Sequence, residues 1–222
     1  MDRNAYTNQA KAWEYAEQRA AAHCPKAAQD ARHAAEQAGV PVGSAAQDAF
    51  LAMLVRLTGA SSVIAVGTRS LTETMALVEG LDGAGHLTVV DSSAQGVDLV
   101  RRTFASQADT ATTLRAVHAQ AADFLPRLNG EDYDLIVVAG DGASYRPVLD
   151  QASRLLRNHG ALVMLDMLAF ADRNAKGGVT NPADRSDKAV AMRALLDALD
   201  EATDFETTLI PVGTGLLIAR KR

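Results

Sequence analysis

The sequence contains one cysteine, Cys24, and no marked excess of charge of either sign. A lone cysteine cannot form an internal disulfide, and it argues against a zinc site built from cysteines. The five histidines do not show the His-x-x-x-His spacing of a metal site. No segment approaches the ~18 apolar residues that cross a bilayer, and the N-terminal segment lacks the apolar core of a signal peptide. We therefore expect a cytoplasmic protein with no membrane partner.

Length and charge are those of an ordinary globular chain. The 222 residues carry 22 basic and 27 acidic side chains, a formal net charge of -5, and 48% of them are hydrophobic. This composition predicts one domain, residues 1–222. The acidic balance argues against a nucleic-acid partner, which requires a basic surface.

The first 58 residues predict helices. Two alanine-rich helices joined at Pro25 are expected between about residues 5 and 37. A third helix is expected to begin after Ser44, which lies three residues before Gln47 as in a capping box, and to end at Gly59.

From residue 59 to residue 222 the pattern changes to short apolar runs separated by segments long enough for helices. This alternation predicts an α/β fold, with a doubly wound and mostly parallel sheet whose functional site lies at the carboxyl ends of the strands. The last two runs are too closely linked for a helical crossover, so they predict an antiparallel hairpin. The predicted strands are residues 62–66, 87–90, 114–117, 135–138, 161–165, 205–210 and 216–220.

Two strand ends carry residues suited to a nucleotide. Gly67 follows the first strand and opens a helix, an arrangement that presents backbone N–H groups to an anionic ligand. Asp91, at the exposed tip of the second strand, could accept the hydroxyls of a ribose. The plainer interpretations are an ordinary turn at Gly67 and, at Asp91, a cap for the helix that Ser92 and Ser93 open.

Two other segments have alternative interpretations. Tyr6, Trp13 and Tyr15 could wall an aromatic substrate pocket, or they could form a packing or dimer contact. The polar stretch between Met167 and Arg185 predicts either a mobile loop over the site or a disordered connection.

Five sequence blocks follow one another from about Ala35 to Arg222: AGVPVGSAAQDAFLAMLVRLTGASSVIAVGT, LTVVDSSAQ, QAADFLPRL, DYDLIVVAGDGASYRPVLDQASRLLRNHGALVMLDML and LIPVGTGLLIARKR. In this order they resemble the O-methyltransferases that include catechol and caffeoyl-coenzyme A methyltransferases. The resemblance implies a Rossmann-like methyltransferase fold of seven strands closed by an antiparallel hairpin, S-adenosylmethionine as cofactor, a small hydroxylated acceptor and a homodimer.

The resemblance also implies which residues hold the cofactor. Gly67 and Thr68 would approach its methionine portion, and Asp91 would bind its ribose. Gln120 stands where relatives carry an aspartate near the adenine, and its amide can still donate and accept hydrogen bonds. The matching positions are Val42, Gly67, Thr68, Asp91, Gln120 and Ala121.

The sequence departs from this family where relatives bind a divalent cation. Relatives place an aspartate after the fourth strand and an Asp-Asn pair after the fifth, and the metal orients a substrate diol. The corresponding residues here are Ala139, Leu165 and Asp166. One carboxylate is too few for an octahedral Mg²⁺ site, so we expect no metal. The family lysine that is a candidate general base is replaced by Gly142.

The cofactor loop departs as well. Arg69 and Leu71 replace glycines, and Ala65 replaces the acid that meets the cofactor's amino group in relatives. Arg69 could pair with the cofactor carboxylate and Glu73 could supply the missing acid. The plainer interpretation is that both are solvated surface charges.

Asp141 and Tyr145 lie just after the fourth strand and are our candidates for acid–base or orienting catalysis, although Asp141 could instead cap the next helix. We expect metal-independent methyl transfer from S-adenosylmethionine to a small hydroxylated acceptor. The alternatives are a degenerate binding or scaffold protein that retains the fold, and a different nucleotide ligand in the same cleft.

Overall fold

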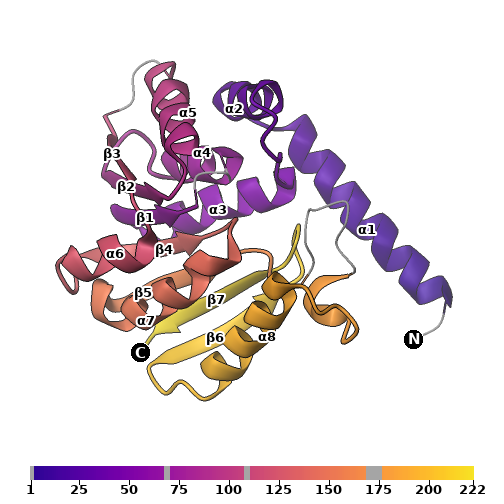
Figure 1. The fold of residues 1–222 in the computed structure, drawn as a ribbon. Coiled ribbons are helices and arrows are strands. Elements are labelled where there is room, and N and C mark those ends of the chain that lie inside the picture. Colours follow the sequence, from indigo (N-terminus) through magenta and orange to yellow (C-terminus); the bar gives the residue numbers. More distant parts are fainter. Residues whose placement is uncertain (1–2, 68–70, 108–110, 169–176) are drawn as a thin grey trace.

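The computed structural model describes residues 3–67, 71–107, 111–168 and 177–222, and of residues 3–6 it describes the backbone alone (Figure 1). Thr68 and Arg69 therefore lie outside the described residues. Among the described helices, none combines the length and the apolar character needed to cross a membrane.

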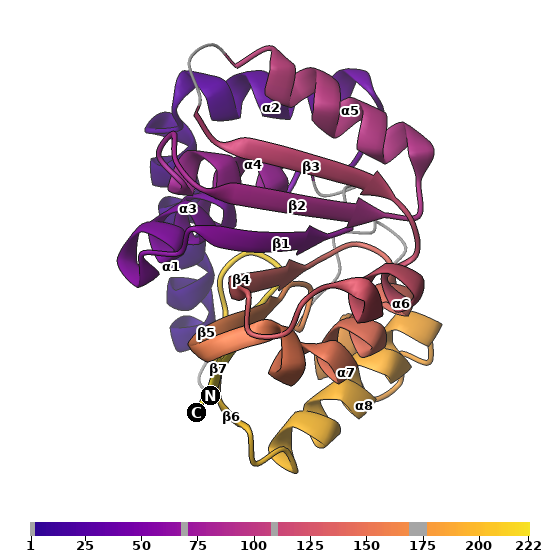
Figure 2. The ribbon, with the colours of Figure 1, turned by 90° about the vertical axis from the view of Figure 1, so that its left-hand side faces the viewer.

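One seven-stranded sheet runs through the molecule in the order β3-β2-β1-β4-β5-β7-β6 (Figure 2). Strands β1 to β5 are parallel, and β7 pairs antiparallel with both β5 and β6. The predicted α/β sheet and its closing hairpin are confirmed. The strands are β1 (Ser62–Val66), β2 (His86–Asp91), β3 (Thr113–His118), β4 (Tyr133–Val138), β5 (Leu156–Met164), β6 (Phe205–Ile210) and β7 (Leu216–Lys221).

The central strands are apolar because helices bury both faces of the sheet there, whereas the outer strands β3 and β6 are largely exposed. In β1, Val63 and Ala65 belong to one hydrophobic core, whereas Ile64 and Val66 belong to the core on the opposite face. Helices α2 to α5 pack on the first core and α6 to α8 on the second (Figure 2). The helices are α1 (Arg3–Ala22), α2 (Lys26–Gln37), α3 (Ala45–Thr58), α4 (Leu71–Gly80), α5 (Ala94–Ala105), α6 (Ala121–Phe124), α7 (Tyr145–Leu155) and α8 (Asp187–Asp200).

Helix α3 begins and ends where the sequence predicts. The Ser44 side chain accepts a hydrogen bond from the Gln47 N–H at 3.1 Å, and Gly59 ends the helix in a left-handed conformation. The Gln47 side chain does not complete the capping box. Its oxygen accepts from the Thr214 N–H at 3.3 Å, which places this side chain between α3 and the β6–β7 turn.

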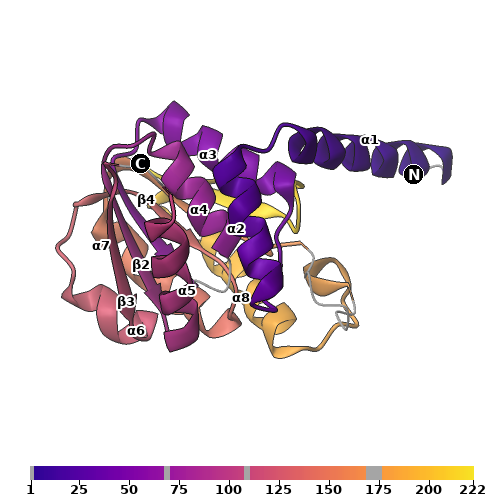
Figure 3. The same ribbon diagram turned by 90° about the horizontal axis from the view of Figure 1, so that it is seen from above.

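Helix α1 is attached to the body through its C-terminal half, and its N-terminal half extends outward (Figure 3). The Glu17 carboxylate accepts hydrogen bonds at the start of α3 from Ser44 Oγ (2.6 Å), Ala45 N (2.6 Å) and Ala46 N (3.1 Å). A carboxylate at this place satisfies free N–H groups and complements the helix dipole. Near the middle of α1, before Glu17, the side chain of Trp13 is 48% exposed and that of Tyr15 is 65% exposed.

Candidate functional site

A cleft of about 1580 Å³ opens at the carboxyl ends of the parallel strands. It lies where β1 and β4 run side by side and their following segments diverge to opposite faces of the sheet, the usual position of a ligand site in a doubly wound fold. Its walls come from the segment before α3, the ends of β1, β2, β4 and β5, helix α5, the start of α8 and the β6–β7 turn. A cleft therefore lies where the sequence predicts the functional site.

Four of the residues expected at the cofactor line this cleft, namely Val42, Gly67, Glu73 and Asp91. Gly67 has a φ of +92°, a backbone conformation that glycine adopts readily. Asp91 is 7% exposed, so the expectation of an exposed strand tip was wrong. The Asp91 carboxylate accepts a hydrogen bond from the Ser93 N–H, and Ser93 itself caps α5 by accepting from the Gly96 N–H at 3.1 Å.

Gln120 and Ala121 lie beside the cleft and do not line it. Gln120 is exposed at the N-terminus of α6, and Ala121 is buried beneath it. The neighbouring Ala119 N–H donates to the Asp91 carbonyl at 2.9 Å, so this turn lies at the same edge of the sheet as Asp91. Trp13 and Tyr15 are not among the described residues that line the cleft, and the side chain of Tyr6 lies outside the described residues.

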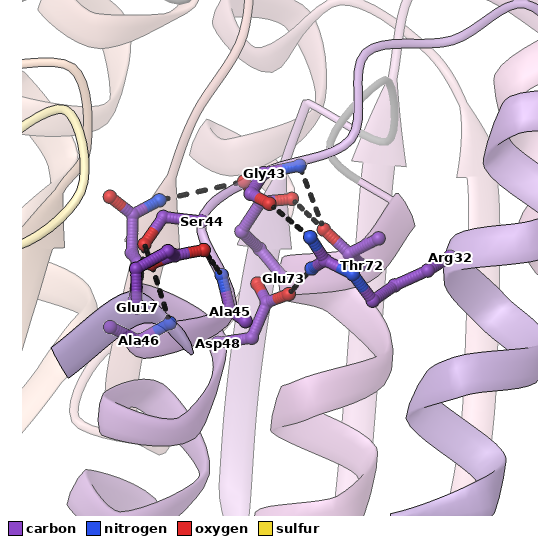
Figure 4. Close-up of polar contacts among 10 residues, drawn as sticks. Glu17, Arg32, Gly43, Ser44, Ala45, Ala46, Asp48, Thr72 and Glu73 are labelled. Atoms are coloured by element: carbon purple, nitrogen blue, oxygen red, sulfur yellow. Dashed lines mark hydrogen bonds and ion pairs between the residues drawn. The ribbon is translucent and has the colours of Figure 1, made fainter. Parts of the chain in front are cut away.

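Glu73 lines the cleft from the first turn of α4 and is 8% exposed, which excludes the solvated-surface interpretation (Figure 4). Its carboxylate accepts hydrogen bonds from Thr72 Oγ1 at 3.0 Å and Gln47 Nε2 at 3.5 Å. Burial raises the pKa of Glu73, against the lowering effect of hydrogen bonds from its own backbone N–H and from Thr72, and the nearby charge of Asp166 raises it further. Glu73 is therefore a buried acid that faces the cleft without a direct basic partner among the residues that the structure describes.

A second buried acid, Asp48 on α3, lies near Glu73 (Figure 4). Arg32 joins α2 to this region by donating to Asp48 Oδ2 and to the Gly43 carbonyl, both at 2.8 Å. Burial and the repulsion of Glu73 nevertheless raise the pKa of Asp48 to about 8. Its other oxygen, Oδ1, has no hydrogen-bond partner within the described part of the chain.

The three positions that match the family's metal ligands also line the cleft. Ala139 and Leu165 offer only hydrocarbon, and the carboxylate of Asp166 is paired with the ammonium group of Lys188 at 2.5 Å. In residues 3–67, 71–107, 111–168 and 177–222 there is no group of three or more His, Cys, Asp or Glu side chains arranged to hold a metal. These donors do not fit an octahedral divalent cation.

Lys188 was missed from the sequence. One local signal was available, because a basic residue in the first turn of a helix opposes the helix dipole and so requires another reason to be there. Arg32, Asp48 and Gln47 were also missed as residues near the site. They are brought together from α2 and α3 by tertiary packing, and no local spacing relates them to the strand ends.

The structure separates the two catalytic candidates. Asp141 lines the cleft, and its carboxylate also accepts a hydrogen bond from the Ala143 N–H at 3.2 Å, so it faces the cleft and caps the next turn at once. Tyr145 is 0% exposed and its hydroxyl donates to the Leu165 carbonyl at 3.0 Å. Burial raises the pKa of Tyr145 well above its ordinary value. The structure therefore corrects the placement of Tyr145, which supports the end of β5 and does not reach the cleft.

The polar stretch after β5 is ordered in its described part. Asp184 is 1% exposed, and its carboxylate accepts hydrogen bonds from the Gly178 N–H and the Ser186 N–H, each at 3.0 Å. Residues 183–186 line the cleft beside the start of α8. Residues 169–176, on which the rest of the loop expectation falls, lie outside the described residues.

Comparisons with known proteins find relatives along most of the chain. A family model described as O-methyltransferase matches residues 25–222. A protein of Mycolicibacterium smegmatis whose name assigns it to the O-methyltransferases is 31% identical over 190 residues, which are 85% of this chain and 87% of the relative.

Two solved structures show the same fold. The O-methyltransferase from Bacillus cereus, in complex with S-adenosylhomocysteine, has a TM-score of 0.75 at 18% identity and covers 96% of this chain and 99% of its own. The S-adenosylhomocysteine-bound methyltransferase from Podospora anserina has a TM-score of 0.73 at 18% identity and covers 100% of this chain and 97% of its own.

Proposed function

The chain belongs to the O-methyltransferase family, and we propose that it transfers a methyl group from S-adenosylmethionine to the hydroxyl of a small acceptor without a divalent metal. The observation that carries this proposal is the cleft at the strand ends, where Gly67, Glu73, Asp91 and Asp141 meet. Gly67, Glu73 and Asp91 would contact the cofactor, and Asp141 would contact the acceptor.

The charge of the cleft suits a cationic cofactor. S-adenosylmethionine carries a sulfonium and an ammonium group, and buried carboxylates are stabilised by a cation that enters their site. Glu73 would hold the ammonium group, in place of the acid that relatives carry at the position of Ala65, and Asp91 would hold the ribose. The acidic residues that line the cleft are Glu73, Asp91, Asp141, Asp166 and Asp184.

When bound, the cofactor supplies a methyl group to an acceptor oxygen, which bonds to the methyl carbon as the carbon–sulfur bond breaks and its electron pair stays on sulfur. The acceptor hydroxyl must lose its proton in this exchange. The Asp141 carboxylate, which lines the cleft, would accept a hydrogen bond from that hydroxyl and then the proton. The remaining contribution of the chain is to hold the acceptor oxygen in line with the methyl group and to exclude water.

Calorimetry with S-adenosylmethionine and S-adenosylhomocysteine tests the cofactor site. We expect both to bind the wild type, and we expect Asp91→Ala to weaken binding by about 1.5–3 kcal/mol, the range for a hydrogen bond to a charged group. Asp197→Ala, which removes an exposed carboxylate from α8, is the matched control and should bind as the wild type does. A thermal melt of each variant separates loss of the ligand from loss of the fold.

Failure of both compounds to bind the wild type would overturn the enzyme proposal. The scaffold alternative, in which the fold outlives the activity, would then be the better account. Equal affinity of the wild type and Asp91→Ala would place the ligand elsewhere.

A further inference from the structure

The ammonium group of Lys188 occupies the edge of the cleft at which relatives bind their metal. Its Nζ donates to Asp166 Oδ2 at 2.5 Å and to the Gly140 carbonyl at 2.9 Å. Asp166 matches one of the family's three ligand positions, and Gly140 directly follows another, Ala139. A positive charge supplied by the chain itself is therefore bonded to the ends of both strands that would present metal ligands.

The charges at this edge of the cleft are consistent with an ammonium group in the place of the divalent cation that relatives bind. Relatives surround a divalent cation with carboxylate and amide oxygens, whereas here two of the three ligand positions are hydrocarbon. The one carboxylate that is left, on Asp166, faces one ammonium group. The side chains are 18% exposed for Asp166 and 24% exposed for Lys188, so the pair is mostly buried yet reaches the cleft.

The position of Lys188 is fixed by the segment that precedes α8. Ser186 caps α8 by accepting from the Ala189 N–H, and Asp184 holds Ser186 and Gly178 together. Lys188 lies in the first turn of α8, where a cation opposes the helix dipole. The helix gains nothing from a lysine at this place, so the reason for the lysine lies in its partners across the cleft.

The stem of Lys188 lies beside the position of the missing family lysine. A Cβ on Gly142 would be in ordinary van der Waals contact with Lys188, 3.6 Å from its Cα and 3.6 Å from its Cγ. The lysine that arrives from α8 therefore lies next to the backbone position at which relatives carry theirs.

We propose that the Lys188 ammonium takes the place of the divalent cation and stabilises the oxyanion of the acceptor, an inference that rests on the proposed methyl transfer. Asp166 and the Gly140 carbonyl both accept hydrogen bonds from Lys188 Nζ, so these two contacts hold the nitrogen in one position. A single ammonium does not chelate two neighbouring oxygens as a metal does. The acceptor class is accordingly a compound with one ionisable hydroxyl, with no requirement for a vicinal diol.

The test uses p-nitrophenol, whose ionised form has its own absorption band, added to the protein saturated with S-adenosylhomocysteine. We expect the wild type to bind the phenolate and to lower the apparent pKa of the probe. Lys188→Met should weaken phenolate binding about tenfold or more, the effect of losing a charged hydrogen bond. Lys188→Arg should restore part of it. Lys26→Met, which removes an exposed lysine of α2 far from the cleft residues, should leave binding unchanged.

Two controls separate the proposed role from others. p-Nitroanisole, which has no hydroxyl to ionise, should bind the wild type and Lys188→Met equally. EDTA and added Mg²⁺ should change neither phenolate binding nor the affinity for S-adenosylhomocysteine.

The inference is overturned if Lys188→Met binds the phenolate as tightly as the wild type, if phenolate binding requires Mg²⁺, or if the wild type binds no phenolate. Calorimetry with S-adenosylhomocysteine on the same samples reports on the proposed function separately. Normal cofactor-product affinity together with any of these three results rejects the role of Lys188 alone.

Discussion

The backbone of Gly67 lies against the carbonyl oxygen of Ala139 so closely that a Cβ on Gly67 would overlap that oxygen. The two residues follow the adjacent strands β1 and β4, and the Ala139 N–H donates to the Val66 carbonyl at 3.0 Å. Gly67 thus meets two requirements at once, a positive φ and a close approach of two backbones.

We expect Gly67→Ala to lower the free energy of unfolding by about 2–4 kcal/mol, because it adds steric overlap to an unfavourable backbone conformation. Gly140→Ala is the matched control. Gly140 also has a positive φ, +82°, but a Cβ there would have no described neighbour within 4 Å, so only the cost of the conformation, about 1–2 kcal/mol, is expected. Urea unfolding measures both. Equal losses for the two variants would contradict the overlap with Ala139.

The second prediction concerns the attachment of α1. Partial burial favours the neutral form of Glu17, but hydrogen bonds from Ser44, Ala45 and Ala46 outweigh it and keep the pKa of Glu17 below its usual range. Glu17→Ala should cost about 1–2 kcal/mol in the free energy of unfolding, since it leaves N–H groups at the start of α3 without a cap.

Glu14→Ala, one turn earlier on α1, is the control for Glu17→Ala. Glu14 is exposed and accepts one hydrogen bond, from Gln18 on the same helix, at 3.3 Å. We expect its loss to change urea unfolding by less than 0.5 kcal/mol, roughly the spread of surface substitutions. A similar loss for both variants would show that the contacts of Glu17 with α3 contribute little.

Local signals were sufficient to predict most of the fold. The central strands β1, β2 and β4 could be located because both of their faces are buried, which makes them largely apolar runs. The ends of α3 could be located because Ser44 and Gly59 act within one turn of the chain. Strand β5 begins at Leu156, five residues before the predicted start at Ala161. After the buried Leu156, residues 157–159 are polar and at least partly exposed, so they lack the apolar pattern that identified the rest.

The site could be predicted only in part, because its chemistry depends on pairs distant in sequence. Gly67 and Asp91 follow strands and were found by position. The pairing of Lys188 with Asp166 joins α8 to β5, and the pairing of Arg32 with Asp48 joins α2 to α3. Tyr145 was misplaced for a related reason, since its distance from β4 does not determine whether its side chain points into the cleft or into the core.

The third prediction is a pH dependence caused by Asp48. The folded chain retains a proton on Asp48 up to a pKa of about 8, whereas an unfolded aspartate releases its proton near pH 4. Between these values the folded state binds more protons, so the free energy of unfolding falls as pH rises, by at most about 1.4 kcal/mol per pH unit for one group. The contribution of Asp48 to the free energy of unfolding is fully present below about pH 4 and is lost as the pH rises through about 8.

Asp48→Asn should make this slope shallower, because the amide keeps the size of the side chain and carries no titrating proton. Urea unfolding at several values between pH 5 and pH 8 measures the slope. Asp30→Asn, which alters an exposed carboxylate on α2, should leave the slope as in the wild type. An unchanged slope in Asp48→Asn would mean that the proton is held elsewhere.

The last prediction concerns assembly, for which we propose a twofold dimer through the N-terminal helices. Helices α1 and α3 are in contact, and both expose large apolar side chains: Trp13, Tyr15, Met53 and Leu57. Residues 7–16 of α1 are exposed, and exposed apolar surface of this kind favours association. A chain that begins at Ala16 removes Trp13 and Tyr15 but retains Glu17 and its contacts with α3. We therefore expect light scattering to show a dimer for the full chain and a monomer for the shortened one, while the melting temperature of dilute samples changes by only a few degrees.

Trp13→Ala combined with Tyr15→Ala should also weaken the dimer, without removing any backbone. A full chain that scatters as a monomer would overturn the dimer, and a shortened chain that still scatters as a dimer would place the interface on another surface.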